Sequence, residues 1–355
     1  MERKAWLRGV WEMVKEAFCQ KLFTCHLPSS PHLLPDQFSS HSVIVTGATS
    51  GIGLHTAREV AMCGAHVTLA CRNTKAAREI AHRWQQEAHA SRVLHVEVME
   101  LDLLSLSSVR SFAAEWERRA RPLHVLINNA GVFLMGEPQK FSDDGIEQHL
   151  QVNHVAPALL TLLLLPSLLR APSSRIINVN SVAHHCAVVN PRQWESRIDE
   201  KKFSSIRAYG ASKLAHLMFL KILASKLMDE RKNCIQCIAV HPGIVTTNLV
   251  RTVPSFRRRS FWRFDPKEGA RSVLFCVASA DVAADLEKGF AYYSCNCKPA
   301  RVSAQAADVD TCMEVWQKTL EIAGLNADYL TQVMDNASNP TLIYRELLGN
   351  TSIIV

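Results

Sequence analysis

A tyrosine and a lysine stand four residues apart in the segment Tyr209-Gly210-Ala211-Ser212-Lys213. The surrounding pattern predicts a helix from about 207 to 228, which puts both side chains on one helical face. An ordinary tyrosine has a pKa of about 10 and is a poor base at neutral pH, but an adjacent ammonium lowers that pKa by favouring the phenolate. The pair could then exchange a proton with a reacting oxygen, although this spacing alone is more often a surface pair.

A serine follows the strand predicted over 175–179. Ser181 lies at the carboxyl end of that strand, where open parallel sheets bind their ligands, so its hydroxyl could hydrogen-bond a substrate oxygen. A serine in this place is more often a turn residue. The joint appearance of Ser181, Tyr209 and Lys213 in this order favours proton transfer at a carbonyl or alcohol oxygen.

A glycine-rich turn comes directly after the first predicted strand, 43–45. It reads Thr46-Gly47-Ala48-Thr49-Ser50-Gly51-Ile52-Gly53 and opens a predicted helix, 52–63. Glycines let the backbone approach a pyrophosphate, whose charge the helix N-terminus stabilises. An ordinary turn does not need three glycines, so this context predicts a dinucleotide site.

The next predicted strand, 66–70, is followed by Arg72 and Asn73, and Arg72 comes 19 residues after Gly53. An acidic residue near this position would bind the ribose 2′-hydroxyl of NAD, whereas an arginine pairs with the 2′-phosphate of NADP. The sequence therefore favours NADP(H) over NAD(H), with a merely solvated arginine as the alternative.

Short apolar runs alternate with helical stretches through most of the chain. Further strands are predicted at 93–101, 123–127 and 234–240. This alternation predicts an α/β fold: a Rossmann-type doubly wound parallel sheet in a single domain, with helices on both faces. We assign residues 42–325 to this catalytic domain, residues 1–41 to an N-terminal helix and linker, and residues 326–355 to a C-terminal tail.

The N-terminal extension has the pattern of an amphipathic helix over residues 3–23. Its apolar face comprises Trp6, Leu7, Val10, Trp11, Val14, Phe18 and Leu22. Such a helix either lies on a membrane surface or packs on its own domain or a partner, and Glu2, Glu12 and Glu16 dilute its positive charge. Both alternatives stay open.

The net charge of +7 is local, because five arginines lie between Arg251 and Arg263. This argues against nucleic acid as a partner. The eleven cysteines are scattered, which favours a reducing compartment on the cytoplasmic side and not secretion. Cys234 and Cys237 have no second pair at zinc spacing, so we expect no metal site. The chain has no apolar run long enough to cross a bilayer.

The motifs together resemble those of the short-chain dehydrogenase/reductase family. They are Thr46-Gly47-x3-Gly51-x-Gly53, Asn128-Asn129-Ala130-Gly131, Asn153, Ser181, Tyr209-x3-Lys213 and Pro242-Gly243. The resemblance covers residues 42–325. Within the family the chain is similar to the retinol dehydrogenase and WW-domain oxidoreductase branch, and more so to the plant Forever Young oxidoreductase group, which implies a plant member.

The resemblance implies a role for each motif. Asn128 and Gly131 would stabilise the fourth strand beside the cofactor, and Asp102 would contact the adenine. Asn153 would hold a water of a proton relay and Ser181 would orient the carbonyl. Tyr209 would transfer the proton, while Lys213 would bind the nicotinamide ribose and lower the tyrosine pKa. The segment after the sixth strand would contact the nicotinamide carboxamide through Pro242, Gly243, Ile244 and Thr246. The remaining cofactor contacts would come from Thr46, Gly47, Ser50, Gly51, Ile52, Gly53, Arg72, Asn73, Asn129 and Ala130.

Two loops, 183–207 and 244–265, should cover the substrate. The second interleaves aromatic and basic residues, so residues 1–24 and 251–264 could contact a membrane that delivers a lipophilic retinoid-, steroid- or lipid-like carbonyl or alcohol; a solvated basic loop is the alternative. Residues 159–165 and the Tyr209 helix could form a homodimer interface; the alternative is that those leucines are buried in the core of one chain.

A non-catalytic NADPH-binding scaffold or sensor is the rival function, and the intact Asn153, Ser181, Tyr209 and Lys213 argue against it.

Overall fold

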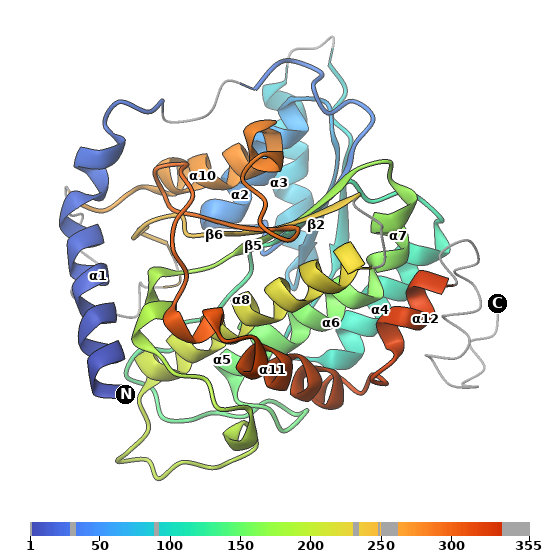
Figure 1. Cartoon of the computed structure of the whole chain (residues 1–355). Coiled ribbons are helices and arrows are strands. Elements are labelled where there is room, and N and C mark those ends of the chain that lie inside the picture. Colours follow the sequence, from blue (N-terminus) through green and yellow to red (C-terminus); the bar gives the residue numbers. More distant parts are fainter. Residues whose placement is uncertain are drawn as a thin grey trace.

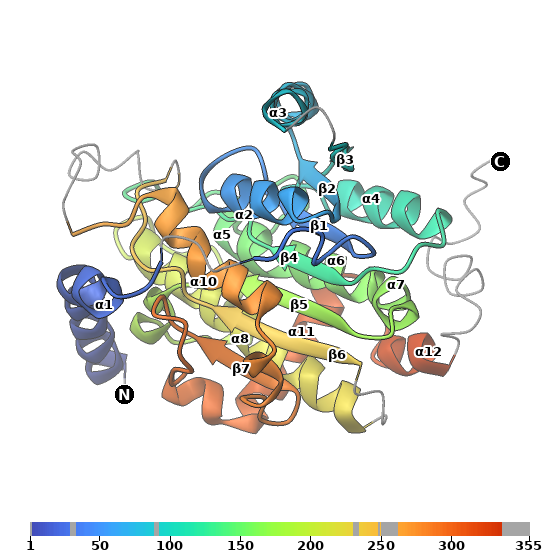
Figure 2. The same cartoon turned by 90° about the horizontal axis from the view of Figure 1, so that it is seen from above.

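A seven-stranded parallel sheet forms the centre of the molecule (Figures 1 and 2). The computed structural model describes residues 2–28, 33–88, 92–229, 234–247, 249 and 262–335, without the side chains of 2–5, 8, 17 and 229. The strand order is β3-β2-β1-β4-β5-β6-β7. The strands are β1 (Ser42–Thr46), β2 (His66–Cys71), β3 (Val96–Glu100), β4 (Val125–Asn128), β5 (Ser174–Val179), β6 (Ile235–Val240) and β7 (Phe290–Tyr293).

Helices cover both faces of the sheet, because strands joined by right-handed crossovers are buried on each side. One face carries α2 (Gly51–Met62), α3 (Thr74–Glu87) and α10 (Pro266–Ala278) (Figure 1). The opposite face carries α4 (Leu106–Arg118), α6 (Ala156–Leu163) and α8 (Ser205–Asp229). The short elements are α5 (Gln148–Leu150), η1 (Gln151–Val155), α7 (Leu165–Arg170), η2 (Val182–Cys186), η3 (Pro191–Gln193), η5 (Asp281–Ala283) and η6 (Ala304–Ala307).

The structure confirms the predicted Rossmann-type fold and the six strands anticipated from the sequence. The third strand is shorter than predicted: it begins at Val96, and Val93 is 72% exposed. The sequence prediction missed β7 and α10. Helix α10 begins with a capping box in which Asp265 and Glu268 each accept a hydrogen bond from the backbone of the other.

Two C-terminal helices close the core beneath α8. Helix α11 (Val309–Ile322) stacks Trp316 on Phe219 of α8, with ring centroids 5.1 Å apart. Helix α12 (Tyr329–Asp335) lies beyond the predicted domain boundary at residue 325, yet its apolar residues Tyr329 and Val333 are buried in the same core. The packed unit thus extends at least to residue 335; the predicted tail residues 336–355 lie outside the described part.

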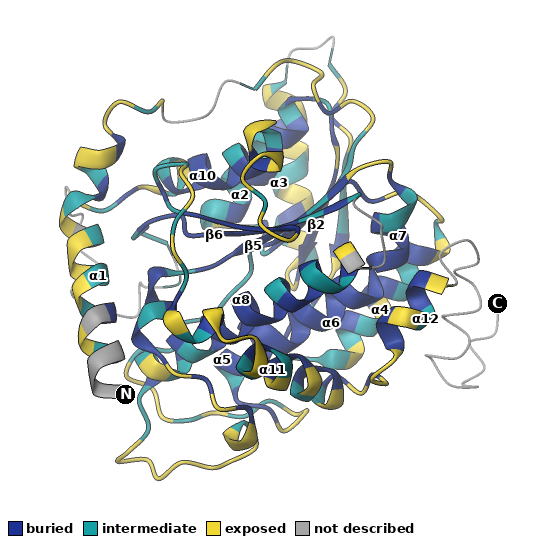
Figure 3. Cartoon of the chain, viewed as in Figure 1, coloured by how far each residue is buried: buried dark blue, intermediate teal, exposed yellow. Residues whose placement is uncertain are grey.

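Helix α1 (Glu2–Thr24) packs along one side of the domain, with its polar face inward (Figure 3). Gly9, Gln20 and Thr24 are buried, and Glu16 faces the loop after β7. Of the alternatives left open by the sequence, the helix packs on its own domain, but most of its apolar face points outward. Five apolar side chains on the outer face are between 43% and 66% exposed: Leu7, Trp11, Val14, Phe18 and Leu22.

Residues Leu159 to Leu165 are buried in the core of the single chain, which agrees with the alternative to a homodimer interface. All eleven cysteines fall within the described ranges and remain thiols. Among the described residues, no helix is both long and apolar enough to span a bilayer.

Candidate active site

The predicted site residues converge on one edge of the sheet because all its strands run in the same direction. Strand β1 is flanked by β2 on one side and β4 on the other, so the chain reverses its direction of travel across the sheet there. Such a switch point is where open α/β sheets bind ligands. The groups following the strands at this edge are Gly47, Arg72, Asp102, Asn129, Ser181 and Pro242.

The glycine-rich turn leaves the N-terminus of α2 open to an anion. Ser50 at the N-cap is extended and its side chain makes no capping hydrogen bond, and the first turn has no acidic residue. The first N–H groups of the helix are therefore not capped by this side chain, and the helix dipole favours negative charge there. Gly47 and Gly51 have φ of 66° and 58°, where a side chain would be strained.

The turn is fixed to the end of β4. Thr46 Oγ1 accepts hydrogen bonds of 3.0 Å from the N–H groups of both Asn129 and Ala130. Asn129 Nδ2 in return donates to the Thr46 carbonyl at 2.9 Å. A Cβ on Gly53 would lie 2.3 Å from that nitrogen, so glycine is required for this close approach. Thr46, Asn129 and Ala130 thus shape the backbone of the predicted pyrophosphate cradle.

The predicted adenine end of the site lies beyond β2 and β3. Arg72 is exposed, and no hydrogen bond or ion pair within the described residues engages its guanidinium. Asn73 caps α3 by accepting from Ala76 N–H at 3.0 Å, and Asp102 Oδ1 accepts from Leu104 N–H at 3.0 Å. An exposed arginine at this strand end is placed to meet a phosphate, and it also fits the solvated alternative.

Asn128 ties β4 to its surroundings. Its Nδ2 donates to Asn178 Oδ1 of β5 at 2.8 Å and to Thr161 Oγ1 of α6 at 3.0 Å. Both contacts are buried, which agrees with the stabilising role implied by the resemblance. A Cβ on Gly131 would lie 3.0 Å from Asn153 Oδ1 and 3.4 Å from Lys213 Nζ, so this glycine adjoins two predicted catalytic side chains.

Asn153 lies in the π-helical turn η1, a rare form that often occurs at functional sites. Its Nδ2 donates to the Val132 carbonyl and to Ser212 Oγ, each at 3.0 Å, and its Oδ1 accepts from Val132 N–H at 2.8 Å. Both hydrogens of the side-chain amide are therefore engaged. Pro157, four residues later, has no N–H to offer the Asn153 carbonyl in the α-helical pattern.

Ser181 and Tyr209 meet above the end of β5. The Ser181 hydroxyl accepts a hydrogen bond from Ala183 N–H at 3.2 Å and interacts with Tyr209. Tyr209 is buried and stacks on Phe133, with ring centroids 4.5 Å apart. Burial raises the pKa of Tyr209, and the bond from Ser181 opposes that rise.

Lys213 is buried one helical turn after Tyr209. Its Nζ donates to the Val179 carbonyl at 2.9 Å, and burial lowers its pKa from 10.5 to about 8. Asn180 holds this arrangement together, because its Nδ2 donates to the Lys213 carbonyl and its Oδ1 accepts from Ser181 N–H. The prediction that Lys213 lowers the pKa of Tyr209 does not hold for the chain without cofactor. There, burial raises the pKa of Tyr209.

The segment Pro242–Thr246 follows β6 and is fixed by two neighbours. Phe264 pairs with it from one side: Phe264 N–H donates to the Ile244 carbonyl at 3.0 Å, and Thr246 N–H donates to the Phe264 carbonyl at 2.9 Å. Helix α1 contacts it from the other side through Gln20. Gly243 has a φ of 87°, where L side chains are strained. The predicted membrane segment, 251–264, lies outside the described residues up to Phe261.

Several polar residues beside this centre were not predicted from the sequence. Asn180 and His241 each directly follow a strand and precede a predicted motif, so their positions alone could have identified them. Glu16 and Gln20 could not be found that way, since they lie more than 200 residues from their partners.

Comparisons with known proteins agree with this geometry. Residues 41–192 match the short chain dehydrogenase family. A protein of Arabidopsis thaliana, Dehydrogenase/reductase SDR family member FEY, is 43% identical over 343 residues, covering 93% of this chain and 90% of its own. Human retinol dehydrogenase 11 is 37% identical, covering 82% and 88%.

A solved structure shares the fold. The crystal structure of an uncharacterised protein from Mycobacterium paratuberculosis covers 82% of this chain and 96% of its own, with a TM-score of 0.64 and 31% identity. With a relative 43% identical over nearly its whole length, the chain belongs to the short-chain dehydrogenase/reductase family of oxidoreductases, which use nicotinamide cofactors.

Proposed function

We propose that this protein is an NADP(H)-dependent oxidoreductase that interconverts a carbonyl and an alcohol, with Tyr209 as the proton donor and acceptor. The observation that carries the proposal is the cluster after β5, where Tyr209 and Lys213 are buried one helical turn apart and Ser181 interacts with Tyr209. The uncapped N-terminus of α2 and the glycines that allow close backbone approach fit a dinucleotide pyrophosphate.

The bound cofactor supplies or accepts a hydride at the carbon of the reacting C–O group. During reduction Ser181 orients the carbonyl oxygen, and Tyr209 gives its hydroxyl proton to that oxygen as negative charge develops there. Lys213 would bind the nicotinamide ribose. The Asn153 carbonyl, which lacks an α-helical donor from Pro157, holds the water that returns a proton through Lys213 to Tyr209. Oxidation of the alcohol uses the same groups in reverse.

Arg72 supports the preference for NADP(H). Its exposed guanidinium follows β2, and the 2′-phosphate would pair with it as an anion. Thr46, Gly47, Ser50, Gly51, Ile52 and Gly53 would hold the pyrophosphate, and Asp102 the adenine.

The decisive experiment compares the full chain with Tyr209→Phe. We expect NADPH titrated by fluorescence to bind both proteins equally, and a panel of lipophilic carbonyl compounds to be reduced by the wild type alone. Equal turnover by both proteins would remove Tyr209 from the mechanism. NADPH binding without any tyrosine-dependent turnover across the panel would favour the scaffold or sensor function.

The exposed stripe of α1 supports a peripheral membrane contact, in which residues 1–24 and 251–264 lie on an anionic surface and receive a retinoid-, steroid- or lipid-like substrate. Trp262, 39% exposed, extends the stripe by contacting Phe18 at a ring separation of 6.1 Å. Tryptophan and phenylalanine suit the interface between headgroups and acyl chains. The proposed location is the cytoplasmic side of a membrane in a reducing compartment of a plant cell.

Vesicle co-sedimentation tests this contact. We expect binding to anionic vesicles that falls strongly for Trp11→Ser with Phe18→Ser and for charge reversal of Arg257, Arg258 and Arg259. Binding unaffected by either set would leave a solvated basic loop. The predicted homodimer through α6 and α8 is a separate proposal, decided by the molar mass in solution.

A further inference from the structure

The inner face of α1 touches both loops that frame the nicotinamide end of the site. A Cβ on Gly9 would lie 2.5 Å from the Cα of Cys186, so the helix rests directly on the backbone of η2, the segment that follows Ser181. Gln20, three turns further along, reaches the segment that follows β6. The helix thus contacts the flanks of both Ser181 and Ile244.

Gln20 is 1% exposed and makes three hydrogen bonds to backbone groups. Its Oε1 accepts from Ile244 N–H at 2.7 Å, and its Nε2 donates to the carbonyls of Ile244 at 3.1 Å and Trp262 at 2.8 Å. Ile244 and Trp262 precede and follow the loop whose residues 250–261 lie outside the described part. One side-chain amide therefore connects the two sides of this loop.

Gly243, which precedes Ile244, leaves room for the Gln20 side chain. A Cβ on Gly243 would lie 2.8 Å from Gln20 Oε1 and 2.7 Å from Phe264 Cδ2. Any side chain at this position would displace Gln20 or Phe264, and with them the backbone bonds of Ile244. The glycine that the family motif places after Pro242 is thus required here for contact with α1.

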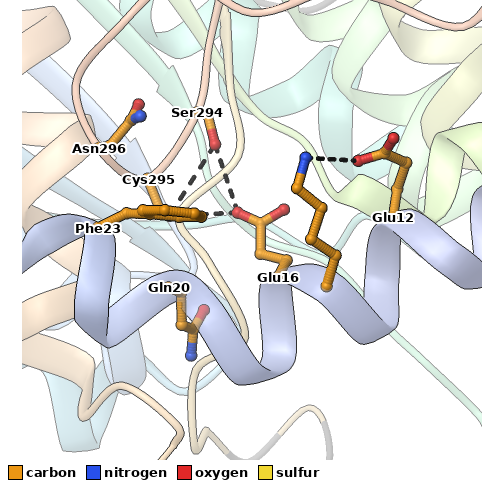
Figure 4. A pocket seen from close by; sticks show the side chains of 8 residues that line it. Glu12, Glu16, Gln20, Phe23, Ser294, Cys295 and Asn296 are labelled. Atoms are coloured by element: carbon orange, nitrogen blue, oxygen red, sulfur yellow. Dashed lines mark hydrogen bonds and ion pairs between the residues drawn. The ribbon is translucent and has the colours of Figure 1, made fainter.

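Glu16 makes the second connection (Figure 4). Its Oε1 lies 3.3 Å from His241 Nε2 and accepts from Ser294 Oγ at 3.3 Å and Cys295 Sγ at 3.2 Å. The other ring nitrogen of His241, Nδ1, accepts from Val182 N–H at 3.2 Å. A continuous path therefore runs from α1 through His241 to the residue after Ser181.

Glu16 carries its charge in this place. Burial alone would raise the pKa of its carboxyl, but the attraction of His241 and the hydrogen bonds from His241, Cys295 and Ser294 lower it to about 2. It borders a cavity of about 200 Å³ with Glu12, Lys15, Gln20, Phe23, Ser294, Cys295 and Asn296, and none of the proposed catalytic residues lines that cavity. The Glu16 contacts thus belong to the docking of α1.

We propose that α1 contributes to nicotinamide binding. In this proposal Gln20 is a positioning residue that holds the Ile244 backbone in the conformation that binds the nicotinamide. This proposal rests on the proposed function and on the resemblance, which implies that the Pro242–Thr246 segment contacts the nicotinamide. Gln20 acts through Ile244 and touches neither substrate nor reacting atoms.

The test replaces Gln20 by methionine, which keeps the length of the side chain and removes its hydrogen bonds. We expect Gln20→Met to raise the Kd and KM for NADPH about tenfold, while the KM of the carbonyl substrate and kcat at saturating NADPH stay near the wild-type values. Lys21→Met is the matched control, since Lys21 pairs with Glu268 of α10 at 3.4 Å, and it should leave NADPH binding unchanged.

Three results would overturn the proposal. Unchanged NADPH binding in Gln20→Met would show that the contact is only structural. Tighter binding would show that the Gln20 amide competes with the nicotinamide amide for Ile244. Equal weakening in Lys21→Met would show that any loosening of α1 has the same effect. If the wild type itself binds no nicotinamide cofactor, the proposed function fails instead.

Hydrogen exchange on the wild-type chain gives a measurement that does not depend on the folding of a variant. NADPH should slow amide exchange in α1 around Gln20 as well as at Ile244, because the two are hydrogen-bonded to one another. Protection at Ile244 without any change in α1 would contradict the proposal.

Discussion

Lys213 Nζ lies 2.9 Å from the carbonyl oxygen of Val179, so the ammonium is held by the end of β5 before any cofactor is bound. This bond compensates only part of the cost of burying the charge, since the pKa of Lys213 falls to about 8. In the proposed mechanism, the lysine is thus held ready for the ribose and for Tyr209 at the expense of stability.

Replacing Lys213 by methionine should stabilise the cofactor-free protein at pH 7 while abolishing turnover. The lowered pKa corresponds to a destabilisation of about 3 kcal/mol, which the substitution removes. The substitution also removes the hydrogen bond to Val179, which costs about 1 kcal/mol of stability. In the unfolded chain the lysine keeps its proton up to about pH 10.5, whereas in the folded chain it loses it near pH 8. Between these values the unfolded state binds more protons, so the wild type gains stability as pH rises.

Urea unfolding at several pH values checks this prediction. The advantage of Lys213→Met over the wild type should be greatest below pH 8 and shrink toward pH 10.5. Lys221→Met, which removes a lysine bonded to the Ala306 carbonyl, should show no such gain. A Lys213→Met protein less stable than the wild type at pH 7 would rule out the burial penalty.

Replacing Ser181 by alanine should lower kcat about a hundredfold, because it removes a donor to the reacting oxygen. It also removes the hydrogen bond that opposes the rise in the pKa of Tyr209. The pH of half-maximal alcohol oxidation, which needs the phenolate, should therefore move upward. Complete pH profiles at saturating cofactor test this, with Ser181→Thr as the control that keeps a hydroxyl; an unshifted midpoint would separate Ser181 from Tyr209.

Replacing Arg72 by glutamine should raise the Kd for NADPH between about tenfold and a hundredfold and leave that for NADH unchanged, since only NADPH carries the 2′-phosphate. Arg83→Gln on the exposed face of α3 serves as the control for overall charge. Parallel fluorescence titrations of both cofactors give the ratio. An equal loss for both would mean that Arg72 contacts a part that they share.

Replacing Thr46 by valine should destabilise the fold by about 2 kcal/mol, because the N–H groups of Asn129 and Ala130 lose their acceptor. NADPH binding should weaken as well, since the glycine-rich turn is fixed through this hydroxyl. Thr46→Ser should restore both properties. Unchanged NADPH affinity in a destabilised Thr46→Val protein would show that the turn keeps its shape without the hydrogen bonds to the Thr46 hydroxyl.

Local patterns were enough to predict most of the sheet and to identify the residues proposed for the reaction. The turn after β1 and the pair Tyr209 and Lys213 can be identified from spacing within eight residues. Strand β7 has only four residues, Phe290–Tyr293, and a single short aromatic run carries no period that distinguishes a strand from a loop.

The orientation of α1 could not be predicted because amphipathicity identifies two faces and does not say which one packs. The answer depends on Gln20 and Glu16, whose partners at Ile244 and His241 are brought near only by the folded sheet. The pKa of Tyr209 likewise depends on burial, which the motif does not specify.

The two faces of α1 have opposite chemistry, since the inner one holds backbone groups near Ser181 and Ile244 while the outer one exposes Trp11 and Phe18. If a bilayer binds only the docked form of α1, bilayer binding would raise the affinity of the protein for the cofactor. Cofactor binding would then raise the affinity of the protein for the bilayer by the same factor. If the proposed lipophilic substrate is dissolved in that surface, thermodynamic linkage of this kind would give the enzyme its full cofactor affinity only where the substrate is found.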